Sequence, residues 1–316
     1  MSLHERLYQW TARQGLDASS ARRLRALAGV DDPPAGAWTP IRRGAGALAA
    51  GLIGFGLILW VAANWDDFGR ALRFGLLEAV LGVALVAAAL LAAWRAPLAM
   101  AAFLALGGLL AYFGQTYQTG ADPWQLFALW AAIGLPIAWA ARSDLVWTPW
   151  ALVVATGIGL WMQTFGGHLW RFDASTVPVH AIGFVAYGAL CAGLAFRPGA
   201  AAQPWAWRIA VLASVVAISG TALGALFERE VGPQFYLGLG VMGVGLVLAW
   251  RHAEVYALSA LALAVDTLLV AGLARAVIEA RGDIGGVFLI GLVACGLLAA
   301  SVSLIMRRVG AKEARA

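Results

Sequence analysis

One stretch of sequence decides the fold class: residues 284–306 read IGGVFLIGLVACGLLAASVSLIM and contain no charged side chain. A helix needs about 20 consecutive apolar residues to cross the hydrocarbon core of a bilayer. Similar stretches recur from Gly44 onward, separated by short breaks rich in charge, proline or glycine. We therefore predict an all-α, polytopic helical membrane protein with about ten transmembrane helices, at residues 44–63, 72–93, 97–114, 124–141, 145–163, 177–196, 205–227, 234–250, 254–275 and 284–306.

The composition of the whole chain agrees with a membrane protein. The chain is 62% hydrophobic and 12% charged, whereas a soluble protein usually has about a quarter of its residues charged. Its net charge of +5 is dispersed over loops and ends, so we attribute it to membrane orientation and expect no nucleic-acid partner. Cys191 and Cys295 lie far apart in apolar stretches and predict neither a disulfide nor a metal site.

Basic residues set the predicted orientation. With the N-terminus in the cytoplasm, most Lys and Arg residues fall on the cytoplasmic side, as the positive-inside rule requires. Both termini are then cytoplasmic, anchored by Arg42 and Arg43 before the first span and by Arg307, Arg308 and Lys312 after the last. Residues 1–43 contain no apolar run, so we expect the first span to be an uncleaved anchor.

The residues before the first span form a small basic segment. Leu3, Leu7 and Trp10 have helical spacing, and Asp17 is placed to cap a second helix that continues to Leu27. We predict four parts: an amphipathic helical hairpin at 1–30, a linker at 31–43, the membrane domain at 44–306 and a basic cytoplasmic tail at 307–316. Around Pro97 the second and third spans have an alternative, a bent re-entrant pair.

Three stretches of the N-terminal half resemble a bacterial family of predicted membrane proteins, domain of unknown function twenty-one fifty-seven. They are Gln9-Trp10 with Gly15-Leu16, then AANWDD (62–67), then GQTYQTGADPWQLFALWA (114–131), and the similarity continues to about Ser143. The resemblance implies an N-terminal amphipathic hairpin followed by a membrane domain, here in the bacterial cytoplasmic (inner) membrane. It implies no activity for individual residues.

Polar residues within or beside the spans are the candidate functional residues. A charge near the bilayer centre costs about 3 kcal/mol on insertion scales, so it must be neutralised, paired or hydrated. We predict a polar pathway or pocket lined by Asp266, Glu78, Gln115, Tyr117, Asn64 and Asp67. Asp266 falls near the middle of its span; the alternatives are a buried pair with Arg275 or a hydrogen-bonded, neutral acid. Glu78 has the alternatives of snorkelling or pairing with Arg73.

Other polar and aromatic residues have structural interpretations. We expect Asp122 to cap the helix that follows it, and His180 to be a hydrogen-bonded packing residue. His168 and Asp173 share a loop but lack a third metal ligand at suitable spacing. The tryptophans at 147–150 and 205–207 are expected to belong to an interfacial belt.

Several functions stay open. GxSxG, HExxH, Walker and Rossmann patterns are absent in their required context, so no enzyme class, metal or cofactor is indicated. The first hypothesis is a small-solute or ion transporter, or a solute-binding membrane sensor, with a pathway opening to the outside. The alternative is a non-catalytic scaffold in the lipid bilayer whose N-terminal hairpin docks a cytoplasmic protein partner. The third is an intramembrane enzyme acting on lipid or envelope precursors.

Overall fold

The structure is a computed structural model and describes residues 3–29, 38–63, 68–117, 120–166, 172–197, 205–252, 254–280 and 284–313. Within these residues all regular secondary structure is helical, as the sequence predicts. The chain divides into two compact units, residues 1–49 and 50–316, which are described separately.

The first unit contains two short helices, α1 (Leu3–Arg13) and α2 (Ala18–Leu27). Gly15 and Gly29 follow them with φ of 56° and 59°, the left-handed conformation that commonly ends a helix. Asp17 has extended backbone dihedrals, and its side chain accepts a hydrogen bond from the backbone N–H of Ser20 at 3.2 Å. The predicted N-cap of α2 is therefore confirmed.

The next helix, α3 (Trp38–Ala63), starts earlier than predicted. Residues 38–43, which we predicted to be linker, form its first turns, because helix formation continues through Pro40 at a position where its missing N–H costs nothing. Residues 44–63 of α3 contain no charged side chain. The predicted span at 44–63 lies inside α3, and its crossing of the bilayer stays a prediction.

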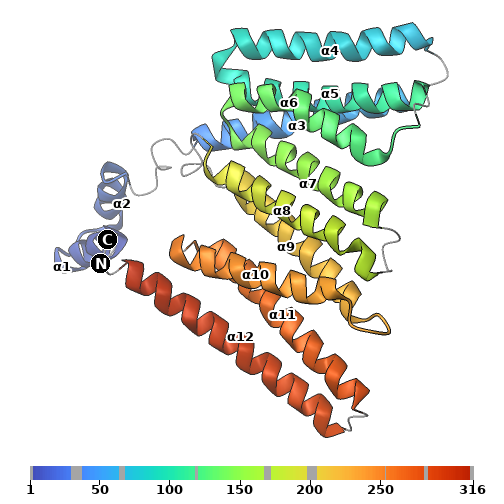
Figure 1. Cartoon of the computed structure of the whole chain (residues 1–316). Helices are drawn as coiled ribbons and strands as arrows, with labels where there is room; N and C mark the ends of the chain where they lie inside the picture. Colours follow the sequence, from blue (N-terminus) through green and yellow to red (C-terminus); the bar gives the residue numbers. More distant parts are fainter. Residues whose placement is uncertain are drawn as a thin grey trace. The chain divides into compact units, whose positions relative to one another are not determined.

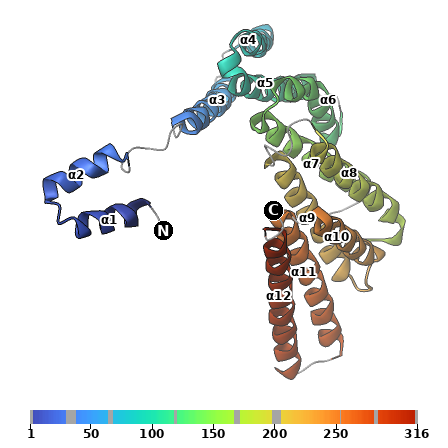
Figure 2. The ribbon, with the colours of Figure 1, turned by 90° about the vertical axis from the view of Figure 1, so that its left-hand side faces the viewer.

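The second unit is a serpentine of long helices, in which sequence neighbours pack side by side (Figures 1 and 2). Among the described residues, nine helices are long and apolar enough to cross a membrane. They are α4 (Arg70–Leu90), α5 (Arg95–Tyr117), which follows the short 3-10 helix η1 (Ala92–Trp94), α6 (Pro123–Ala141), α7 (Asp144–Gly166), α8 (Val177–Ala195), α9 (Trp205–Leu226), α10 (Pro233–His252), α11 (Val255–Glu279) and α12 (Ile284–Glu313).

These nine helices correspond to nine of the ten predicted spans. At Pro97 the chain has two separate full-length helices, because Pro97 stands in the first turn of α5, where proline is tolerated. Both helices are long and apolar enough to cross the bilayer separately, which favours the two predicted spans over the re-entrant alternative. At the other end α12 continues to Glu313, so residues 307–313 of the predicted tail are helical.

Helix α9 is at the centre of the unit and packs against α7, α8, α10 and α11, whereas α4 packs chiefly against α5 and α12 chiefly against α11. Helices α4 and α12 consequently lie at opposite ends of the row (Figure 1).

The interface between α5 and α6 shows how glycine permits close packing. Phe103 stacks on Trp130 with ring centroids 5.2 Å apart, and the Trp130 indole donates a hydrogen bond to the Phe103 carbonyl oxygen at 2.9 Å. A Cβ atom at Gly134 would come 2.4 Å from the Phe103 ring, and one at Gly107 would come 2.3 Å from the Trp130 ring. Each aromatic ring therefore occupies space that any other residue at these glycines would fill.

Candidate functional site: a buried carboxyl between two groups of polar contacts

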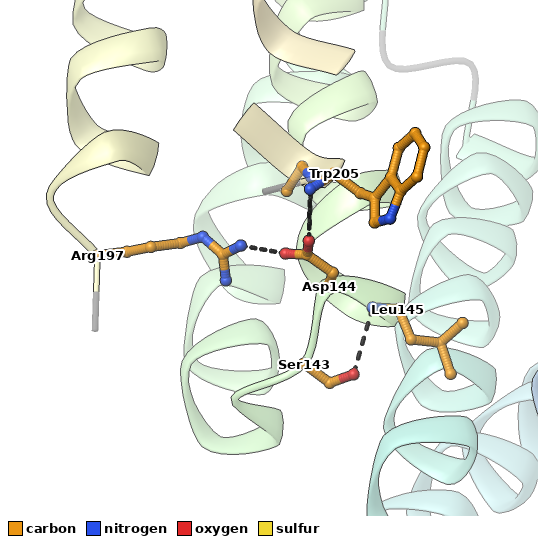
Figure 3. Close-up of polar contacts among 6 residues, drawn as sticks. Ser143, Asp144, Leu145, Arg197 and Trp205 are labelled. Carbon is orange, nitrogen blue, oxygen red and sulfur yellow. Dashed lines mark hydrogen bonds and ion pairs between the residues drawn. The ribbon is translucent and has the colours of Figure 1, made fainter. Parts of the chain in front are cut away.

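Asp144, the first residue of α7, joins three helices (Figure 3). Its carboxylate forms an ion pair with Arg197, which follows the end of α8, and accepts a hydrogen bond from the backbone N–H of Trp205 at 2.7 Å. Trp205 is the first residue of α9, so the carboxylate also satisfies a free N–H group and the positive end of that helix. The Asp144 and Arg197 side chains are only 11% and 3% exposed.

Arg197 is further stabilised by an aromatic ring. Its guanidinium carbon lies 5.5 Å from the centre of the Trp147 ring, a distance suited to a cation–π interaction. Trp147 is 5% exposed, and the Trp150 indole donates to the Ala131 carbonyl oxygen at 2.9 Å. The prediction of an interfacial belt is wrong for Trp147, because its ring is buried in packing between helices. For Trp150, which is partly exposed, it stays a prediction.

A second carboxylate repeats this arrangement at the same end of the bundle. Glu254 accepts a hydrogen bond from the backbone N–H of Ala257 at 2.7 Å and caps α11. Arg208, in the first turn of α9, donates to Glu254 from Nε at 3.0 Å and from Nη2 at 2.8 Å. We call this the Asp144 end, where α7, α9 and α11 begin. Two acids each cap a helix there and bind an arginine of a neighbouring segment.

The opposite end of α11 is tied to α9 by Arg275. Its guanidinium donates to the Leu226 carbonyl oxygen, to the Glu228 carbonyl oxygen at 2.7 Å and to the Arg229 carbonyl oxygen at 3.0 Å. It also pairs with Glu279 at 2.6 Å. We call this the Arg275 end. Because these partners occupy Arg275, the alternative in which it neutralises Asp266 is wrong.

Asp266 lies between the two ends. It stands 11 residues after the first residue of α11 and 13 before the last, which is about 17 Å and about 20 Å along the helix axis. The residue is 8% exposed, and its Oδ2 atom is buried with no hydrogen-bond partner among the described residues. A buried carboxyl oxygen without a partner is costly, so this position requires an explanation.

The helical period shows which neighbour covers Asp266. Ala262, one turn earlier on α11, packs with Ile305 of α12, and Val277, three turns later, lies 2.5 Å from where a Gly286 Cβ on α12 would stand. Residues on one helical stripe face the same neighbour, so Asp266 faces α12. The register between these two contacts puts it level with residues 297–301, and α12 carries no charged residue from 284 to 306.

The other predicted site residues lie elsewhere. Glu78 is exposed on α4, and Gln115 is exposed near the end of α5. Tyr117 lies against the Phe74 ring at 6.0 Å and under the Arg70 guanidinium at 5.8 Å. All three therefore belong to the α4–α5 pair, at the opposite end of the row from Asp266 (Figure 1). The remaining predicted residues, Asn64 and Asp67, lie outside the described residues, as does His168.

Two of the structural interpretations can be compared with the geometry. His180 is 5% exposed, and its Nδ1 lies 2.8 Å from the Thr176 carbonyl oxygen, which can only accept, so a hydrogen-bonded packing role is confirmed. Asp122 occupies the N-cap position of α6 with extended backbone, but its side chain makes no capping hydrogen bond. Pro123 at N1 reduces the number of free N–H groups that a cap would satisfy.

The ion pairs at the Asp144 end were not predicted from the sequence. These residues, Asp144, Arg197, Arg208 and Glu254, each stand at or near the end of an apolar span, where a charged residue normally faces water. Nothing in the linear sequence therefore marks them as partners. Only the packing of α7, α8, α9 and α11 brings them together.

Comparison with known proteins supports the membrane assignment. No curated protein and no solved structure matches the chain. Residues 8–147 match the model of the DUF2157 family, described as a predicted membrane protein, which confirms the resemblance found in the N-terminal half of the sequence.

Proposed function

We propose that the protein is a small-solute or ion transporter, or a solute-binding membrane sensor, and that Asp266 is its binding group within the membrane. The buried Oδ2 atom without a partner carries the proposal. Ionisable residues at this depth are rare in membrane proteins, where they commonly mark solute or ion pathways. The cost of keeping such a group is understandable if a solute or water supplies the missing partner during function.

Polar contacts at both ends of α11 are compatible with a site at Asp266 that is closed to solvent. Arg208 and Glu254 hold the beginnings of α9 and α11 together, and Arg275 holds their ends. These contacts hold α11 against α9 at both ends, so the side of Asp266 that faces α12 is the side at which solvent would approach. On the predicted orientation, the Asp144 end faces the cytoplasm.

Glu78, Gln115 and Tyr117 are not included in this pathway, because they are on the α4–α5 pair. Helix α12 is the proposed cover of the site, since Asp266 faces it and α12 packs chiefly against α11. Helix α12 packs chiefly on α11 and contacts α10 through Arg308 over the Trp250 ring, whereas α9 packs on four helices. The contact between α11 and α12 can therefore open with less loss of packing than the centre of the unit.

Thiol labelling tests the proposal. Asp266→Cys is made with Cys191 and Cys295 replaced by Ser, inserted in vesicles and treated with a membrane-impermeant thiol reagent from each side. Leu268→Cys is the matched control, because Leu268 lies on the same helix and is 0% exposed in the core. We expect labelling at position 266 and none at position 268, with the reactive side identifying the opening.

The other outcomes discriminate between functions. Labelling at both positions would mean that the variant is loosely folded. In that case Asp266→Asn is compared with Asp266→Glu for solute flux in proteoliposomes. Only the Asp266→Glu variant should retain the flux. Absence of labelling at 266 in a correctly inserted protein would place Asp266 in a closed bundle. That result would contradict the pathway and favour the scaffold function.

A further inference from the structure

The two N-terminal helices leave large apolar side chains uncovered. Tyr8 is 77% exposed, Trp10 is 64% exposed and Leu27 is 81% exposed. Helix α2 buries none of its residues. Helices of 11 and 10 residues are marginal in water unless an apolar face is packed against something else. The exposed side chains therefore indicate a surface that another apolar or amphipathic environment covers.

The same helices are basic. Arg22, Arg23 and Arg25 are all exposed. The helical period places Arg22 and Arg25 on the side of α2 away from Leu27, whereas Arg23 lies one turn before Leu27 on the same side. Segment 3–29 contains five arginines and two acidic residues, Glu5 and Asp17, and Asp17 is engaged in capping α2. Helix α2 thus carries two arginines on the side away from Leu27 and a third beside it. Arginines that flank apolar side chains in this way are typical of helices that lie in a membrane interface.

We propose that α1 and α2 bind the anionic lipid headgroups of the bilayer in which the long helices are embedded. In this arrangement Trp10 and Leu27 enter the interface between headgroups and acyl chains. The arginines extend along the surface to the lipid phosphates, as long basic side chains do at interfaces. This proposal is independent of the transport function, since it requires no solute pathway.

The length of chain before the membrane helices favours lipid over a separate protein partner. Only residues 28–37 separate α2 from α3, whose apolar stretch begins at Gly44. A short connection to a membrane-inserted chain keeps the two helices at a high effective concentration near the lipid surface. Three arginines near an anionic surface contribute about 1 kcal/mol each, which corresponds to a preference for the bound state on the order of 100-fold.

The test uses the full chain in lipid nanodiscs. Leu27→Cys, with Cys191 and Cys295 replaced by Ser, carries an environment-sensitive fluorophore. The discs contain either phosphatidylcholine alone or phosphatidylcholine mixed with phosphatidylglycerol. We expect the label to enter an apolar environment in the anionic discs. Replacement of Arg22, Arg23 and Arg25 by Gln should lower the ratio of bound to free label on the order of 100-fold.

Controls separate lipid binding from other causes. Arg229→Gln removes an exposed arginine from the connection between α9 and α10 and should leave the label unchanged. Added salt should weaken binding in the native-sequence background, because the interaction with the surface is screened. A label that stays in water in both kinds of disc would overturn the proposal. Equal apolar environments in both discs, unaffected by the arginine substitutions, would also overturn it and indicate a protein contact.

Discussion

Removal of the Asp144 carboxylate should strongly destabilise the membrane unit. Asp144 and Arg197 are 11% and 3% exposed in their side chains, so the pair belongs to the buried class. Breaking such a pair by removing one partner costs about 3 to 5 kcal/mol, since the other charge stays buried and uncompensated. Asp144→Ala should reach the upper part of this range because it also removes the cap of α9.

A double-mutant cycle separates the pair from the cap. Arg197→Met leaves Asp144 with its backbone N–H donors and should cost less than Asp144→Ala. The combined variant Asp144→Asn with Arg197→Met retains an acceptor for the Trp205 N–H and leaves no buried charge. We expect it to be more stable than Asp144→Asn alone, by about 2 kcal/mol or more.

The assay is unfolding in mixed micelles of mild detergent and dodecyl sulfate, followed by tryptophan fluorescence. The 15 tryptophans of the chain supply the signal, and each variant is compared by its free energy of unfolding. A loss below about 1 kcal/mol for Asp144→Ala would refute the reasoning, because a pair of that strength belongs to the solvent-exposed class.

Three further predictions follow from other contacts. Arg208→Gln should cost less than Asp144→Ala, about 1 to 2 kcal/mol in the same assay, because the Arg208 and Glu254 side chains are 29% and 27% exposed; an equal loss would contradict this ranking. Gly134→Val should separate α5 from α6 at Phe103 and cost about 3 kcal/mol, since backbone and ring must move apart; an unchanged stability would show that the interface is looser than described. Hydrogen bonding from Ser19 and Ser20 lowers the pKa of Asp17 from 3.8 to about 2, so its contribution to α2 is complete above pH 3.8 and is lost as the pH falls through about 2. An NMR titration of this carboxyl in the full chain should show the low midpoint, and a midpoint at 3.8 would mean that the cap does not form.

The helices could be located from the sequence because the length and hydrophobicity of each apolar stretch depend only on neighbouring residues. A run such as 284–306 is apolar throughout its length and contains no charged residue. These two properties are enough to predict α12. Boundaries were less certain where helix formation extends beyond the apolar run. Residues 38–43 and 307–313 include basic side chains and are still helical, because a helix can continue into the headgroup region and beyond.

The candidate site was only partly predictable, for a different reason. Asp266 could be found because a carboxyl in the middle of an apolar run is conspicuous by itself. Its separation from Glu78 could not be predicted. Both residues are acidic residues within apolar runs, but their helices, α11 and α4, lie near opposite ends of the row. Depth along a span is encoded locally, whereas the order in which spans pack is not.

The sequence by itself determined the class of protein, the location of the long apolar helices and the presence of one carboxyl near the middle of α11, because hydrophobicity and charge act through length and composition alone. Only the tertiary structure decided the partners of the charged residues: Asp144 with Arg197, Glu254 with Arg208, and Arg275 with the backbone after α9. Apolar helices can pack against one another in many orders with similar hydrophobic gain. Polar contacts require particular distances and angles, and so they depend on the arrangement that the whole chain adopts.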